Sequence, residues 1–205
     1  MARIEFFFDC SSPWTYLAFH RIQPLARETG IDIEWRPVLV GGIFNAVNQS
    51  VYAAREKPVP AKAAYMRKDL GDWARHCGLR IVFPPRIFPV NSVKAMRGCI
   101  VAGEEGKLVP FAGAVFEAYW GEDRDIAQDD VLADLCGRVG IAASPFLRAI
   151  AEPAVKERLK ANTDEAIRRG AFGSPTLFVD GDDMYFGNDR LELVMAAARG
   201  GSAPS

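Results

Sequence analysis

The sequence has little of what marks several large classes of protein. Among its 205 residues are only two histidines and four cysteines, and the cysteines form no Cys-x-x-Cys pair. This composition argues against a zinc site and a disulfide framework, so we expect no metal ligands. No apolar run reaches the roughly eighteen residues of a membrane span, and Glu5 and Asp9 interrupt the N-terminal segment where a signal peptide is apolar. We therefore expect a cytoplasmic protein that makes no membrane contact.

Neither sign of charge is in excess. The chain has 25 Lys and Arg against 26 Asp and Glu, a formal net charge of −1, and its basic residues are scattered. We expect no nucleic-acid partner, since such binding requires a basic patch. Hydrophobic residues make up 49% of the chain, which is enough for a soluble protein with a sizeable core.

The apolar pattern changes twice along the chain. Residues 1–45 contain a short aromatic strand, a helical pattern and an alternating strand, an order that predicts a parallel pair with a crossover helix. Residues 46–164 have helical spacing throughout, whereas residues 165–205 return to two short strands around Gly181 and a helix that begins near Asp189. We predict a thioredoxin-like α/β fold with a large all-helical domain inserted between its β-α-β half and its β-β-α half.

The turn after the first strand, in the segment FFFDCSSPWTYLA, is the main candidate site. Ser12 and Pro13 are the residue types of a helix N-cap and first position, and a helix N-terminus stabilises a thiolate or another anion. The two cysteines of a thioredoxin-like redox motif would stand at Ser12 and Thr15, so hydroxyls replace both sulfurs. The ordinary alternative is that Ser12 only caps the helix. We expect Cys10 to be buried packing.

Three segments in this order resemble the signatures of a known family. FFFDCSSPWTYLA, AFGSPTLFVDG and YFGNDRLELV are similar to segments of 2-hydroxychromene-2-carboxylate isomerases and of the related kappa-class glutathione transferases. The resemblance implies a homodimer, glutathione as the cofactor and Ser12 as the catalytic residue. Ser12 would donate its hydroxyl hydrogen to the glutathione thiolate and so lower the pKa of that thiol.

The resemblance also implies a set of glutathione contacts. Pro175 would be the cis-proline beside the reactive turn, and the backbone of Ser174 would pair with glutathione as an added strand does. Asp189 would meet the γ-glutamyl ammonium and Asn188 its carboxylate, although an acid there is also an ordinary helix cap. The complete set is Ser12, Pro13, Trp14, Asn48, Ser174, Pro175, Asn188 and Asp189.

Substrate contacts are implied at fewer positions. Lys62 and Asn91 match family positions where they would hold the substrate carboxylate or a developing enolate. The alternatives for Lys62 are the glutathione carboxylate and an ordinary solvated lysine on a helix face. Trp14 and Phe44 would form an apolar wall for a small aromatic substrate, although such aromatics are more often core residues. Arg190 is either a ligand contact or a structural ion-pair partner.

The resemblance predicts an isomerase rather than a transferase. The expected reaction interconverts 2-hydroxychromene-2-carboxylate and trans-o-hydroxybenzylidenepyruvate, a step in the breakdown of naphthalene-type aromatics, by reversible addition of the glutathione thiolate. The alternatives are a kappa-like glutathione transferase or peroxidase, a thiol-disulfide oxidoreductase, and a non-catalytic glutathione-binding protein. The missing Cys-x-x-Cys disfavours the oxidoreductase.

Overall fold

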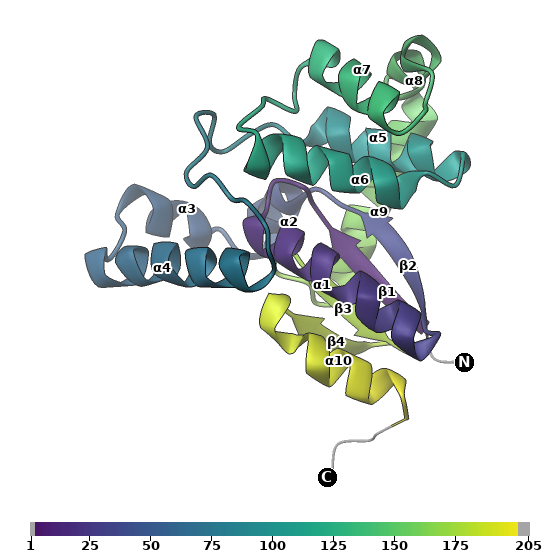
Figure 1. The fold of residues 1–205 in the computed structure, drawn as a ribbon. Coiled ribbons are helices and arrows are strands. Elements are labelled where there is room, and N and C mark those ends of the chain that lie inside the picture. The colour runs from purple at the N-terminus through teal and green to yellow at the C-terminus, as the bar shows by residue number, and fades with distance from the viewer. Residues whose placement is uncertain (1–2, 201–205) are drawn as a thin grey trace.

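The computed structural model describes residues 3–200 and contains one mixed sheet (Figure 1). Its strands are β1 (Arg3–Phe8), β2 (Asp32–Pro37), β3 (Thr176–Val179) and β4 (Asp183–Phe186), in the order β2-β1-β3-β4. β1 runs parallel to β2 and antiparallel to β3, and β3 runs antiparallel to β4. The predicted β-α-β unit and the later hairpin are both confirmed.

The rest of the chain is mostly helical. The helices are α1 (Pro13–Thr29), α2 (Val40–Val47), α3 (Ser50–Glu56), α4 (Pro60–His76), α5 (Val93–Glu104), α6 (Leu108–Phe116), α7 (Asp129–Arg138), α8 (Ala143–Ala149), α9 (Pro153–Arg168) and α10 (Leu191–Ala198). Helices α2 to α9 separate β2 from β3 in the chain, as expected of a thioredoxin-like fold with a helical insertion. The ends expected for that insertion, residues 46 and 164, fall inside α2 and α9. No helix of the described residues is long and apolar enough to span a bilayer.

Strand β1 is an inner strand of the sheet and is buried along most of its length. Its residues alternate, so Ile4, Phe6 and Phe8 face the main core, which also contains side chains of α1 and α10. Phe7 faces the opposite side, where it belongs to a smaller cluster with Ala166 of α9. The aromatic run that predicted a buried strand thus supplies both cores.

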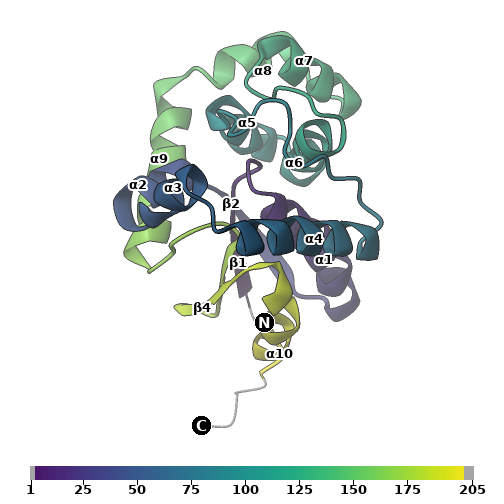
Figure 2. The ribbon, with the colours of Figure 1, turned by 90° about the vertical axis from the view of Figure 1, so that its left-hand side faces the viewer.

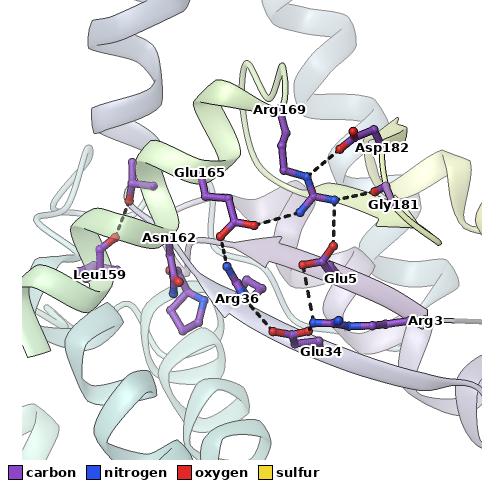
Figure 3. Close-up of polar contacts among 12 residues, drawn as sticks. Arg3, Glu5, Glu34, Arg36, Leu159, Asn162, Glu165, Arg169, Gly181 and Asp182 are labelled. Carbon is purple, nitrogen blue, oxygen red and sulfur yellow. Dashed lines mark hydrogen bonds and ion pairs between the residues drawn. The ribbon is translucent and has the colours of Figure 1, made fainter.

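A polar network fastens the end of α9 to the sheet (Figure 3). Arg169 pairs with Glu5 of β1 at 2.8 Å and with Asp182 of the β3–β4 turn at 3.2 Å. Glu165, one helical turn earlier, contacts both Arg169 and Arg36 of β2. These contacts fix the start of the segment that leads into β3.

Helices α3 and α4 project from the rest of the molecule, as Figure 1 shows and as Figure 2 shows from the projecting side. No residue of α3 is buried, and α4 buries only Leu70 and Ala74. One contact between α4 and α1 places the guanidinium carbon of Arg21 4.6 Å from the ring centroid of Trp73. This pair of helices therefore has little hydrophobic anchoring.

Candidate functional site

The turn from β1 to α1 has the cap geometry predicted from its sequence. Ser12 has extended backbone angles, φ −107° and ψ 123°, and its Oγ accepts a hydrogen bond from the Thr15 N–H at 3.2 Å. Pro13 opens the helix, where its missing N–H costs no hydrogen bond. The same Ser12 hydroxyl donates to the carbonyl oxygen of Ser174 at 3.0 Å. Ser12 is therefore both a helix cap and a link to a distant segment.

That distant segment contains the expected cis-proline. The peptide bond between Ser174 and Pro175 is cis, as the resemblance implied. The Ser174 Oγ lies 2.8 Å from the Thr15 Oγ1 and accepts a hydrogen bond from the Asp9 N–H at 3.0 Å. The fold thus brings the cis-proline against the first turn of α1.

Asp9 is a buried member of the site that the sequence reasoning did not single out. Its carboxylate is 1% exposed and accepts hydrogen bonds from the Ser11 N–H at 2.9 Å, the Val40 N–H at 2.8 Å and the Ser92 hydroxyl at 3.0 Å. Burial raises the pKa of Asp9 above its ordinary value, while the hydrogen bonds from Ser11 and Val40 oppose that rise. Asp9 connects the turn to the starts of α2 and α5. An acid directly after an apolar strand was the available signal.

Cys10 is buried packing, as expected. It is 0% exposed, its N–H contacts the Met96 sulfur at 3.3 Å, and its carbonyl accepts from the Trp120 indole N–H at 2.9 Å. Burial, together with the neighbouring Cys99, raises the pKa of the Cys10 thiol well above its ordinary value. A neutral, enclosed thiol is a poor nucleophile, which disfavours a redox role for this residue.

Asn188 and Asp189 lie beside the cis-proline. The Gly187 N–H donates to the Pro175 carbonyl at 3.2 Å, and Gly187 has a φ of 106°, which favours glycine. Asn188 is 5% exposed, and its side-chain Nδ2 has no hydrogen-bond partner among residues 3–200. Asp189 is exposed and pairs with Arg190 at 2.8 Å. This ion pair is one of the two explanations expected for Arg190.

Asn48 lies close to the same segment. Its Nδ2 donates to the Phe172 carbonyl at 3.0 Å, and its Oδ1 accepts from the Ser50 hydroxyl at 2.8 Å. Phe172 is two residues before Ser174, so the end of α2 adjoins the chain that leads into the cis-proline. The amide already has a partner at each end.

The other predicted residues are less closely connected. Lys62 is exposed in the first turn of α4, and its side chain has no hydrogen bond or ion pair within residues 3–200. The Asn91 Oδ1 accepts from the Val93 N–H at 3.1 Å, next to the Ser92 that reaches Asp9. Trp14, in the first turn of α1, is half-buried. None of these contacts forms a direct link to Ser12.

Comparison with known proteins gives a consistent family. A model of the DsbA-like thioredoxin domain matches residues 3–198. A 2-hydroxychromene-2-carboxylate isomerase of Pseudomonas putida is 32% identical, over 95% of this chain and 93% of its own. Human glutathione S-transferase kappa 1 is 31% identical, over 93% of this chain and 88% of its own.

Structural comparison agrees with the sequence comparison. A solved structure of 2-hydroxychromene-2-carboxylate isomerase superposes with a TM-score of 0.80 at 30% identity, covering 95% of this chain and 93% of that one. The shared fold includes the helical insertion and extends over the candidate site. The chain belongs to the 2-hydroxychromene-2-carboxylate isomerase family, within the DsbA-like thioredoxin domains.

Proposed function

We propose that this protein is a glutathione-dependent isomerase that interconverts 2-hydroxychromene-2-carboxylate and trans-o-hydroxybenzylidenepyruvate. The observation that carries the proposal is the position of the Ser12 hydroxyl, at the N-terminus of α1 and 3.0 Å from the carbonyl oxygen that precedes cis-Pro175. Family membership supplies the reaction, and this hydroxyl supplies a donor for it. Cys10, the cysteine next to this turn, is not the nucleophile, because its thiol is enclosed.

The residues around Pro175 fit the ends of glutathione. The buried, unpartnered Nδ2 of Asn188 is a donor for the γ-glutamyl carboxylate, and the exposed carboxylate of Asp189 is an acceptor for the ammonium. The backbone of Ser174 would pair with the cysteinyl backbone, as an added strand does. We include Pro13, Trp14 and Asn48 in the same binding surface because they adjoin these segments.

Ser12 acts by stabilising a negative charge on sulfur. When bound, glutathione supplies a thiolate that adds reversibly to the conjugated carbon of the substrate and so permits rotation about the adjoining bond. The Ser12 hydroxyl hydrogen now points at Ser174, and rotation about the Cβ–Oγ bond redirects it while Oγ still accepts from Thr15. The N-terminus of α1 favours the same charge. Lys62 and Asn91 are proposed as polar contacts for the substrate oxygens.

Three further features are proposed, the first from the apolar pattern of the sequence and the other two from the resemblance. These are a cytoplasmic location, a place in the breakdown of naphthalene-type aromatics, and a homodimer. Sedimentation equilibrium measures the last of these directly, with a mass of twice 22.5 kDa expected.

The proposal is tested by replacing two adjacent serines. Ser12→Ala should lower kcat/KM for glutathione-dependent chromene isomerisation by roughly 10- to 100-fold, the value of a hydrogen bond to a charged group. Ser11→Ala is the matched control and should stay within about threefold of the wild type. Unchanged activity in Ser12→Ala would remove Ser12 from the mechanism.

Calorimetry with glutathione tests the binding step separately. Wild-type protein should bind glutathione, and Asn188→Ala should weaken that binding by roughly tenfold. Absence of any binding would refute every glutathione-based function. Turnover of 1-chloro-2,4-dinitrobenzene with no isomerase activity would instead indicate a transferase.

A further inference from the structure

Arg55, in the projecting helix α3, lies between two aromatic rings. Its guanidinium carbon is 5.7 Å from the ring centroid of Phe44 and 5.6 Å from that of Phe88, both within cation–π range. Arg55 is exposed, and its side chain makes no hydrogen bond or ion pair with any residue of the described range 3–200. Its positive charge therefore has aromatic neighbours but no counter-charge.

Phe44 adjoins the cis-proline side of the candidate site. A Cβ placed on Gly173 would lie 3.8 Å from the Phe44 ring and 2.8 Å from the Phe186 ring. Gly173 directly precedes Ser174, whose carbonyl accepts the Ser12 hydroxyl. Glycine at 173 thus leaves room for the ring edges next to this carbonyl.

Phe88 is linked through Trp120 to the turn that precedes Ser12. Its ring centroid lies 6.4 Å from that of Trp120, and the Trp120 indole N–H donates to the Cys10 carbonyl at 2.9 Å. Cys10 is two residues before Ser12. Arg55 therefore contacts one ring that lies near Gly173, before the Ser174 carbonyl, and one ring that is linked through Trp120 to the turn before Ser12.

A cation flanked by aromatic faces fits one kind of small molecule. A guanidinium forms paired hydrogen bonds with a carboxylate, and flat rings pack favourably on other rings. An aromatic compound that carries a carboxylate satisfies both groups at once. A neutral aromatic compound would satisfy only the rings.

We propose that Arg55 binds the carboxylate of the aromatic substrate while Phe44 and Phe88 pack against its ring. This assignment rests on the proposed function and deepens it, because it names the residue that selects a charged substrate over a neutral one. Lys62 makes no cation–π contact within residues 3–200, and it stays proposed as a contact for the other substrate oxygens. The carboxylate site then lies on α3, outside the sheet and its core.

The test separates charge from shape by using two ligands that differ in one group. The binding of 2-hydroxycinnamate and of its neutral amide, 2-hydroxycinnamamide, is measured by calorimetry in the presence of glutathione. Arg55→Gln should weaken binding of the carboxylate by roughly 10- to 100-fold and leave binding of the amide within about twofold. Arg55→Lys should retain part of the affinity for the carboxylate, because it keeps the charge and loses the planar fork.

Arg67→Gln is the matched control, since Arg67 is an exposed arginine of α4 that has no ion pair among the described residues. It should bind both ligands as the wild type does. Equal weakening of the two ligands by Arg55→Gln would mean that Arg55 only holds α3 in place, and would overturn the proposal. Undiminished carboxylate binding in Arg55→Gln, or no carboxylate binding by the wild type, would overturn it as well. Glutathione binding, measured alone on the same samples, shows independently whether the proposed function has failed.

Discussion

Two helical regions between β2 and β3 differ sharply in how they are held. Helix α5 buries seven of its twelve residues, whereas the seventeen-residue α4 buries two and α3 buries none. At the start of α5, the Ser92 hydroxyl donates a hydrogen bond to Asp9, and within α5 the Met96 sulfur contacts the Cys10 N–H. This helix therefore packs directly beneath the turn from β1 to α1. Helices α3 and α4 lie on the outer side of the site, where α3 carries Arg55 and α4 carries Lys62.

The difference separates two tasks that a binding site requires. The hydroxyl of Ser12 must be held in one position, and the packed α5–α6 region provides the support for it. The outer side, where we propose the substrate contacts, is free to vary, because α3 and α4 bury few residues and little of the stability of the fold depends on them. Substitutions in the two regions should therefore have unequal and sometimes opposite effects.

The largest contrast is expected between two aromatic residues. Phe116 of α6 is 0% exposed, and its ring stacks on Tyr16 at 5.2 Å, whereas Tyr65 of α4 is 64% exposed. Phe116→Ala should lower the free energy of unfolding by about 3–5 kcal/mol, because it leaves a cavity in the core. Tyr65→Ala should change it by less than about 0.5 kcal/mol. Urea denaturation of both variants measures the two values, and similar losses would refute the distinction between the regions.

A second pair of variants should differ in sign. A Cβ on Gly98 of α5 would lie 2.7 Å from the Phe146 ring and 2.8 Å from the Phe111 ring, whereas one on Gly71 of α4 would meet only the end of Arg75, at 3.6 Å. Gly98→Ala should destabilise the fold by about 1–3 kcal/mol through overpacking. Gly71→Ala should stabilise it by about 0.5–1 kcal/mol, because alanine is the better helix former. Thermal unfolding of both variants measures the sign of each change in stability. Stabilisation by Gly98→Ala would show that Gly98 is not tightly packed against Phe146 and Phe111.

The smallest contrast is a difference in pH dependence between two acids. Burial raises the pKa of Asp9 above its ordinary 3.8, so the folded state binds the carboxyl proton more tightly than the unfolded state does. The contribution of Asp9 to the free energy of unfolding therefore falls as pH rises from about 4 through the raised pKa. The hydrogen bond from Lys68 lowers the pKa of the exposed Asp72, so its contribution is present above 3.8 and is lost as pH falls through the lowered pKa.

Denaturation of Asp9→Asn and Asp72→Asn across pH 3–8 checks these signs. Relative to the wild type, Asp9→Asn should gain stability as pH rises, and Asp72→Asn should lose it. Parallel curves for Asp9→Asn and the wild type would mean that the hydrogen bonds to the carboxylate cancel the effect of burial.

The parts of the site that the sequence predicted are those with a local cause. Serine before proline specifies a helix cap within four residues, and the cap hydrogen bond to Thr15 is present. The short apolar, aromatic run of the first strand identified a buried strand without reference to the rest of the chain. The cis bond at Pro175 came from the family resemblance, since a proline alone does not reveal its isomer.

Asp9 and Arg55 were missed because their roles depend on distant partners. The three donors to the Asp9 carboxylate come from the turn itself and from the starts of α2 and α5. An exposed arginine in an exposed helix has no distinguishing sequence pattern. Phe44, eleven residues earlier, and Phe88, thirty-three residues later, give Arg55 its aromatic surroundings.

The sequence by itself determined the order of strands and helices, the cap at Ser12 and the absence of both cysteines of a redox motif, because propensity, periodicity and residue identity act over short stretches of chain. Only the tertiary structure decided which groups meet. Ser12 and Ser174 are 162 positions apart, and their 3.0 Å hydrogen bond exists because β1 and β3 pair in one register. Register and packing are collective properties of the whole chain, and the geometry of the site follows from them.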